Sequence, residues 1–260
     1  MQKHKLFRIN QPLQTIVRFM KACIMKVFLK IEGGLDEIPS IDTLIEHMIN
    51  VFEKTAFEVA AELLEIEAIK INHKIPFTWS SGWKSPIYCD NRLALSYPSI
   101  RLKIKKYLAE AVRLNYPDVE CIAGVATAGI AQGALVADEL NLPFVYVRPK
   151  PKEHGMGNLI EGKIVKGQKV VLIEDLISTG GSSLKAAQAM RDEGFKVIGM
   201  VAIFTYGFTA AEKNFQEANI PLTCLSDFNH LLQQAVKNNY LDEDQLIYVK
   251  SWRLDPANWK

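Results

Sequence analysis

Residues 170–183 have the sequence VVLIEDLISTGGSS, in which a short apolar run is followed by two adjacent acids and then by small hydroxyl and glycine residues. The apolar run predicts a buried strand over residues 169–173, with Glu174 and Asp175 directly after it. Glycines allow backbone N–H groups to converge on an anion, hydroxyls add donors, and the N-terminus of a following helix carries roughly +0.5 of a charge. The segment therefore predicts a turn that binds phosphate.

The two acids need an explanation of their own, because carboxylates beside a bound phosphate would repel it. Sugar hydroxyls or a divalent cation would be suitable partners for them. The alternative interpretation is an ordinary strand-to-helix turn with a capping serine and two exposed acids. The chain has neither a G-x-x-x-x-G-K-[ST] loop nor a G-x-G-x-x-G turn, so these two phosphate-binding motifs are excluded.

Other apolar runs flank this segment and alternate with stretches of helical periodicity. Runs that are apolar throughout predict strands covered on both faces, and their alternation with helices predicts a parallel sheet. The predicted strands span residues 119–125, 144–147, 169–173 and 196–204, and the predicted helices span 130–140, 183–193 and 209–218. The expected fold class is α/β, a parallel sheet with helices on both faces, and ligands should bind beyond the carboxyl ends of the strands.

A smaller element is predicted on the N-terminal side of this sheet. Helical periodicity runs from Ile41 to about Glu67, and a second helix begins at Pro98, a residue that is tolerated in the first turn. Between these helices, short aromatic runs broken by Ser-Ser-Gly and Ser-Pro predict a small hood at about residues 68–92. The predicted core of the main domain is residues 117–230, and this domain as a whole is expected to span residues 48–260.

The composition is that of an ordinary globular protein, with 260 residues, 48% hydrophobic and 23% charged. The net charge of +2 argues against nucleic acid as a partner, and no apolar run reaches the roughly 18 residues of a membrane span, so no membrane partner is expected. The four cysteines are far apart, without a C-x-x-C pair, which favours reduced thiols in a cytoplasmic protein over a zinc site or a disulfide framework. They are Cys23, Cys89, Cys121 and Cys224.

The first 47 residues differ in character from the rest of the chain. Seven Lys and Arg residues lie between Met1 and Lys30, and no acid precedes Glu32. A targeting peptide, a basic arm that touches nucleic acid or membrane, and a poorly ordered extension or a start assigned too far upstream are the three interpretations. The last is favoured, because the segment lacks a clean apolar core with a cleavage site and has few aromatic residues.

A second charged segment follows the predicted strand that ends at Val147. Residues 148–158 carry Arg148, Lys152 and His154 among Pro bends and Gly hinges. Such a run is either a solvated surface loop or a lid that closes on a pyrophosphate and neutralises charge on a leaving group. The other histidines, His4, His47, His73 and His230, are isolated and are interpreted as surface or packing residues.

Three segments in this order resemble those of orotate phosphoribosyltransferases, a family of the type I phosphoribosyltransferases. They are the hood sequence FTWSSGWKSPIYCDNR at residues 77–92, the lid at 148–158 and the acid-pair loop at 174–182. The resemblance extends from about Phe52 to about Pro256. The acid-pair loop is shared with the wider superfamily, whereas the hood and the Lys-x-His of the lid are specific to the orotate enzymes.

The resemblance implies a homodimer that uses Mg²⁺ and joins orotate to phosphoribosyl pyrophosphate in pyrimidine biosynthesis. The ion would be held mainly by the substrate, near Glu174 and Asp175, without a metal site of the protein's own. Arg148, Lys152 and His154 would act on the pyrophosphate, with the lid reaching into the partner subunit's site. The acids would hold the ribose hydroxyls and the following loop the monophosphate. The implied substrate-binding residues are Glu174, Asp175, Leu176, Ile177, Ser178, Thr179, Gly180, Gly181, Ser182, Lys84, Tyr88 and Arg92.

The chain departs from some relatives at Ser80, Ala128 and residues 205–207, where those relatives carry cations. We therefore expect Arg92, or the backbone amides of the hood, to recognise the orotate carboxylate, the alternative for Arg92 being a structural ion pair. Residues 124–129 would hold pyrophosphate through backbone N–H groups. The aromatic run at 204–208 would either stack on a base or pack in the core. Transfer to another base and a non-catalytic sensor of phosphoribosyl pyrophosphate remain as alternative functions.

Overall fold

The computed structural model describes residues 41–72, 74–79, 81–150 and 159–259. The chain falls into two units, Met1–Asn50 and Val51–Lys260, and helix α2 (Ile41–Glu65) runs through the boundary between them. The second unit contains the sheet and the helices that cover it. Among the described residues, no helix combines the length and the apolar composition that a membrane crossing requires.

A six-stranded sheet with the order β10-β9-β8-β5-β6-β7 forms the centre of the second unit. Its strands are parallel except β7, which pairs antiparallel with β6 at the edge. The predicted parallel sheet is therefore confirmed, with β7 and β10 added to the four predicted strands. The bounds are β5 (Cys121–Val125), β6 (Phe144–Val147), β7 (Ile160–Glu161), β8 (Lys169–Ile177), β9 (Lys196–Thr205) and β10 (Leu222–Asp227).

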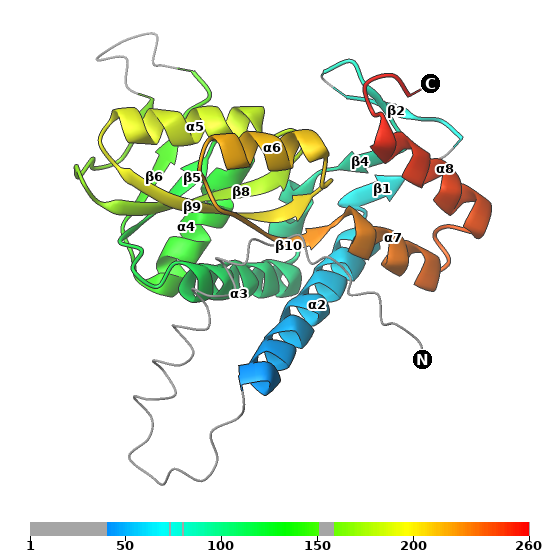
Figure 1. The fold of residues 1–260 in the computed structure, drawn as a ribbon, viewed down its shortest axis with the longest axis horizontal. Coiled ribbons are helices and arrows are strands. Elements are labelled where there is room, and N and C mark those ends of the chain that lie inside the picture. Colours follow the sequence, from blue (N-terminus) through cyan, green and yellow to red (C-terminus); the bar gives the residue numbers. More distant parts are fainter. Residues whose placement is uncertain (1–40, 73, 80, 151–158, 260) are drawn as a thin grey trace, which may run out of the picture. The chain divides into compact units, whose positions relative to one another are not determined.

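Helices cover both faces of this sheet (Figure 1). Helices α5 (Gly181–Asp192) and α6 (Thr209–Glu217) lie on one face, and α3 (Pro98–Asn115) and α4 (Ala128–Leu140) lie on the other. Consecutive residues of a strand point to opposite faces, so β8 contributes Leu172 to one buried cluster and Val171 to the other. This two-sided burial is the reason why the strands are apolar along their whole length.

The central strand β8 is longer than its sequence predicts. The acids were expected to lie after a strand ending at Ile173, but the strand continues to Ile177, and α5 begins at Gly181 instead of Ser183. The physical reason is the neighbouring strand β9, which continues to Thr205 and pairs with Leu176 and Ile177. The acids are therefore part of the sheet, and only residues 178–180 connect it to the helix.

The predicted hood consists of two small antiparallel sheets followed by a short 3-10 helix. Its elements are β1 (Ile69–Ile71) paired with β4 (Ile87–Cys89), β2 (Phe77–Thr78) paired with β3 (Lys84–Ser85), and η2 (Asn91–Ser96). The C-terminal helix α8 (Glu243–Leu254), which the sequence did not predict, ties the hood to the body, since Trp252 Nε1 donates to the Lys84 carbonyl at 3.0 Å.

The aromatic run after β9 belongs to the core. Phe204, Tyr206 and Phe208 are all buried, and the Tyr206 ring lies 4.9 Å from Trp79 and 5.5 Å from Trp252, measured between ring centroids. Of the two interpretations, core packing is confirmed by these contacts. The run therefore joins the hood, the sheet and α8 in one aromatic cluster.

His230 is a packing residue, which is one of the two interpretations of the sequence, but it is not isolated. It lies on α7 (Phe228–Lys237), a second unpredicted helix, and its Nδ1 lies 3.0 Å from Asp227 Oδ1 while its Nε2 lies 3.3 Å from Glu53 Oε2 on α2. The ring also meets the edge of Phe57 at 4.8 Å. The contact with Glu53 joins residues 177 positions apart in the chain, which periodicity within one helix cannot reveal.

We expect the stability contributed by His230 to depend on pH. The hydrogen bond and charge of Asp227 raise the pKa of His230 above 6.5. The charged imidazole therefore stabilises the fold fully below pH 6.5, and this contribution is lost as the pH rises through the raised pKa. Urea unfolding should show that His230→Gln loses more stability at pH 6 than at pH 9. An equal loss at both pH values would contradict the ion pairs as its cause.

Candidate active site

Glu174 and Asp175, here called the acid pair, are held by different elements. Glu174 is 6% exposed, and its carboxylate accepts hydrogen bonds from the Ser183 hydroxyl on α5 at 2.9 Å and from the Asp175 N–H at 3.0 Å. The Asp175 carbonyl accepts a hydrogen bond from the Asn91 side-chain amide of η2 at 2.7 Å. The acid pair is therefore braced by α5 on one side and by the hood on the other.

Both carboxyl groups bind protons more readily than free acids do. Burial raises the pKa of Glu174 well above 4.5, and the neighbouring Asp175 charge acts in the same direction. Burial also raises the pKa of Asp175, although the Arg92 guanidinium opposes this effect. Hydroxyl groups or a cation that approach two such acids are bound favourably, because hydrogen-bond donors and positive charge stabilise the ionised carboxylates. The acid pair is thus suited to a polyhydroxylated ligand.

The segment after the acid pair, residues 178–183, is named the amide turn. Gly180 has a φ of +79°, and helix α5 follows it directly. Among the described residues, the backbone N–H groups of the amide turn donate to no acceptor of the chain. Unpaired N–H groups at a helix N-terminus form an anion site, so the predicted phosphate turn has the required geometry.

Residues 124–129, predicted to be a loop, span the end of β5 and the start of α4 and lie against the same strand. A Cβ atom at Gly129 would come within 2.4 Å of the Ile173 carbonyl oxygen and 3.4 Å of Glu174 Cα. Glycine is needed there because the backbones of α4 and β8 approach this closely. The structure therefore brings this loop, predicted to hold pyrophosphate through its amides, next to the acid pair.

The predicted cations of the hood have partners within the protein. Arg92 donates two hydrogen bonds to the Asp90 carboxylate, at 2.6 and 2.9 Å, which is the ion pair named as the alternative for this residue. Charge interactions nevertheless link Arg92 with Tyr88 and Asp175, so these three predicted residues lie in one neighbourhood. Lys84 instead donates to the Thr78 hydroxyl at 2.7 Å within the β2–β3 hairpin.

The base of the predicted lid is well defined. The Arg148 N–H donates to the Leu159 carbonyl at 2.8 Å, and its guanidinium lies 3.3 Å from Glu161. The first residue of the lid and the residue that follows the lid therefore lie side by side next to the β6–β7 pair. Lys152 and His154 lie outside the described residues.

The sequence did not single out Ser183 or Asn91 as site residues. Ser183 is the last residue of the quoted stretch 170–183 and lies one position beyond the acid-pair loop, and Asn91 lies within the quoted hood segment. Ile177, in turn, was expected to bind substrate, but its side chain is fully buried in the core, so only its backbone is available to a ligand. Among the described residues, no group of three or more His, Cys, Asp or Glu side chains could hold a metal ion.

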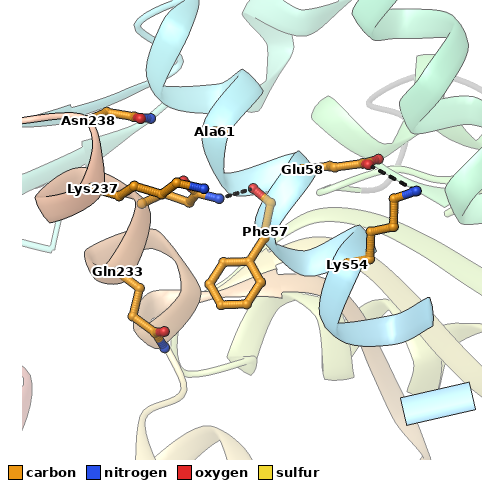
Figure 2. A pocket seen from close by; sticks show the side chains of 8 residues that line it. Lys54, Phe57, Glu58, Ala61, Gln233, Lys237 and Asn238 are labelled. Atoms are coloured by element: carbon orange, nitrogen blue, oxygen red, sulfur yellow. Dashed lines mark hydrogen bonds and ion pairs between the residues drawn. The ribbon is translucent and has the colours of Figure 1, made fainter. Parts of the chain in front are cut away.

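A pocket of about 660 Å³ lies elsewhere, between α2 and α7 (Figure 2). Figure 2 shows Phe57 on the side of α2 toward Gln233 and Lys237 of α7, and the Lys54–Glu58 ion pair on the other side of α2. None of the predicted site residues lines it. The candidate active site therefore lies at the carboxyl end of β8 and not in this pocket.

A family model described as "Phosphoribosyl transferase domain" matches residues 95–230. Together with the acid pair and the amide turn on a parallel sheet, this match defines the chain as a type I phosphoribosyltransferase. A curated protein from Cytophaga hutchinsonii, named orotate phosphoribosyltransferase, is 59% identical over 203 residues, which cover 78% of this chain and 97% of that protein. The chain belongs to the orotate phosphoribosyltransferase family.

Two further comparisons agree with this assignment. An orotate phosphoribosyltransferase from Porphyromonas gingivalis is 54% identical over 201 residues, 77% of this chain and 96% of that protein. The crystal structure of orotate phosphoribosyltransferase from Aeropyrum pernix is similar with a TM-score of 0.62 and 27% identity, covering 71% of this chain and 99% of that one. The predicted fold, family and enzyme class are therefore confirmed.

Proposed function

We propose that the protein transfers the phosphoribosyl group of phosphoribosyl pyrophosphate to orotate in pyrimidine biosynthesis, giving orotidine monophosphate and pyrophosphate. The C1–O bond of the sugar breaks and its electron pair leaves with pyrophosphate, while a C–N bond to the orotate ring forms and the ring nitrogen releases its proton. The observation that carries the proposal is the acid pair directly beside the amide turn at the carboxyl end of β8. Membership of the orotate family identifies the acceptor.

The site acts mainly by positioning and by charge. The acid pair accepts hydrogen bonds from the ribose hydroxyls, and the amide turn binds the 5-phosphate, with Ser178 also reaching orotate. As the C1–O bond breaks, positive charge develops on the sugar and negative charge on pyrophosphate. Carboxylates near the sugar and backbone amides near the pyrophosphate therefore stabilise the transition state. The loop at residues 124–129 supports the pyrophosphate, and Arg148, Lys152 and His154 neutralise it.

Mg²⁺ fits this site as part of the substrate complex. The ion prefers oxygen ligands and is commonly bound through one or two carboxylates together with substrate phosphates. Asp175 is half-buried at the end of the sheet and can supply such an oxygen, whereas both Glu174 oxygens already accept hydrogen bonds. When bound, the ion would offset the negative charge of the pyrophosphate.

We further propose that the active form is a homodimer in which the lid of one subunit serves the site of the other. A cytoplasmic location is proposed as well, because Cys89, Cys121 and Cys224 are free thiols in the described structure. Gel filtration and the mixing of two differently inactivated variants test the dimer. Recovery of activity on mixing a lid variant with an acid-pair variant would support a shared site, and no recovery would contradict it.

The direct test of function mixes purified protein, Mg²⁺, phosphoribosyl pyrophosphate and orotate and follows the loss of orotate absorbance. Formation of orotidine monophosphate and pyrophosphate in equal amounts is the expected result. Turnover with a purine but not with orotate would identify another base as the acceptor. Binding of phosphoribosyl pyrophosphate without turnover of any base would instead support a sensor.

Arg92 tests how orotate is recognised. If its guanidinium contacts the orotate carboxylate, Arg92→Ala should raise KM for orotate about tenfold, with KM for phosphoribosyl pyrophosphate nearly unchanged. Because Asp90 already engages Arg92, Asp90→Asn should free the guanidinium and leave orotate binding intact or tighter. An unchanged KM for orotate in Arg92→Ala would assign this residue to the ion pair alone.

A further inference from the structure

We propose that Asn91 is a positioning residue that joins the hood to the acid pair and holds Asp175 in the orientation that binds ribose. This inference rests on the proposed function. Asn91 is the first residue of η2 and is 1% exposed, although its side chain is an amide with donors and acceptors that must be satisfied. A polar side chain buried this completely is held by specific partners within the protein.

The Asn91 amide bridges two segments that are far apart in the sequence. Its Nδ2 donates to the Asp175 carbonyl oxygen at 2.7 Å, and its Oδ1 accepts a hydrogen bond from the Cys89 thiol at 3.3 Å. Burial raises the pKa of Cys89 well above 9.0, so the sulfur keeps its proton and remains a donor. The S–H group on one side and the carbonyl on the other leave only one suitable orientation for the amide.

The hydrogen bond reaches β8 where its support from the sheet is reduced. Strand β5 pairs with β8 only as far as Ile173, whereas β9 continues alongside as far as Ile177. Beyond Ile173, the described sheet therefore flanks β8 with a strand on one side only. Asn91 provides a hydrogen bond to the main chain of Asp175 in this region, and the direction of the Asp175 side chain depends on that main chain.

The arrangement links the hood to the acids that contact the sugar. A rigid main chain at Asp175 reduces the conformational freedom that its carboxylate would lose on binding. Asn91→Ala removes the donor and leaves both the Asp175 carbonyl and the Cys89 thiol without this partner. Asn91→Asp keeps the shape, but it places an acceptor against the carbonyl and adds a further negative charge near the acid pair.

The experiment measures the affinity for phosphoribosyl pyrophosphate by calorimetry, together with KM and kcat, for the wild type, Asn91→Ala, Asn91→Asp, Cys89→Ser and Cys89→Ala. Loss of one buried hydrogen bond should lower the affinity of Asn91→Ala for phosphoribosyl pyrophosphate about tenfold. KM for orotate should stay within about twofold of the wild-type value. Cys89→Ser keeps a donor and should stay near wild type, whereas Cys89→Ala should fall between wild type and Asn91→Ala. Thermal unfolding checks that each variant is folded.

A double-mutant cycle separates positioning from a general structural role. If Asn91 acts through Asp175, then Asn91→Ala should weaken binding much less in an Asp175→Asn background than in the wild type. The penalty for an analogue that lacks the ribose hydroxyls should also be smaller in Asn91→Ala. Additive effects, or an equal rise in both KM values, would overturn the inference. A wild-type protein that binds phosphoribosyl pyrophosphate but does not use orotate would instead refute the proposed function, and the calorimetric comparison would still test Asn91.

Discussion

Glu174→Gln is expected to stabilise the folded protein at pH 8 while lowering kcat/KM for phosphoribosyl pyrophosphate by about 100-fold or more. The raised pKa of Glu174 means that its ionised form is disfavoured in the folded state. This cost is absent below pH 4.5 and grows as the pH rises towards the raised pKa. Glutamine removes the charge, its carbonyl can accept from the Asp175 N–H, and its amide can donate to the Ser183 hydroxyl.

Urea unfolding at pH 4.5 and pH 8, combined with steady-state kinetics, tests this prediction. The gain in stability should be large at pH 8 and small at pH 4.5. Glu139→Gln is a matched control of opposite sign, because Lys105 lies 2.7 Å from Glu139 and lowers its pKa. That variant should lose a little stability at neutral pH and keep its activity. A Glu174→Gln protein less stable than wild type at pH 8 would show that the buried charge is not a cost.

Gly180→Ala is expected to damage both the fold and the site. Gly180 has a φ of +79°, which costs an L-residue on the order of 1 kcal/mol, and its new Cβ would lie 2.6 Å from Phe215 Cε2. Relief of this overlap would move the amide turn, and a shift of about 1 Å in a substrate-binding group can lower the rate about 100-fold. Together we expect a loss of about 3 kcal/mol in stability and a kcat/KM about 100-fold lower.

The neighbouring glycine provides the control. A Cβ at Gly181 would have only Thr179 Oγ1 as a neighbour, at 4.0 Å, and the residue begins helix α5. Gly181→Ala should therefore keep or slightly increase the melting temperature. Adding Phe215→Leu to Gly180→Ala should restore part of the lost stability by removing the overlap. If Gly180→Ala and Gly181→Ala melt at the same temperature, the tight contact with Phe215 is not a constraint.

Much of the sheet could be predicted, because a strand buried on both faces is a continuous run of apolar residues in the sequence. Strand β6 begins and ends at the predicted residues 144 and 147, and β5 and β9 differ from their predicted bounds by one or two residues at one end. Strand β8 is four residues longer than predicted, and the two-residue strand β7 was missed. Strand β10 was missed, since it lies at the edge of the sheet and only alternate positions along most of its length are buried. Helices α7 and α8 were also missed, although Asp227 and Asp242 cap them in the expected way.

In the candidate active site, too, some features follow from neighbouring residues in the sequence and others only from tertiary contacts. Two acids followed by a Gly- and Ser-rich turn and a helix are neighbours in the chain, so the amino-acid sequence by itself determined the acid pair, the turn that follows it and, through the hood and lid motifs, the family. Tertiary structure alone decided that β8 carries the acids inside the sheet, that Asp90 pairs with Arg92, and that Asn91 reaches Asp175 across 84 residues. The reason is physical: a turn and a buried strand follow from local propensity and burial, whereas the partner of a polar group depends on which distant element the completed fold places beside it.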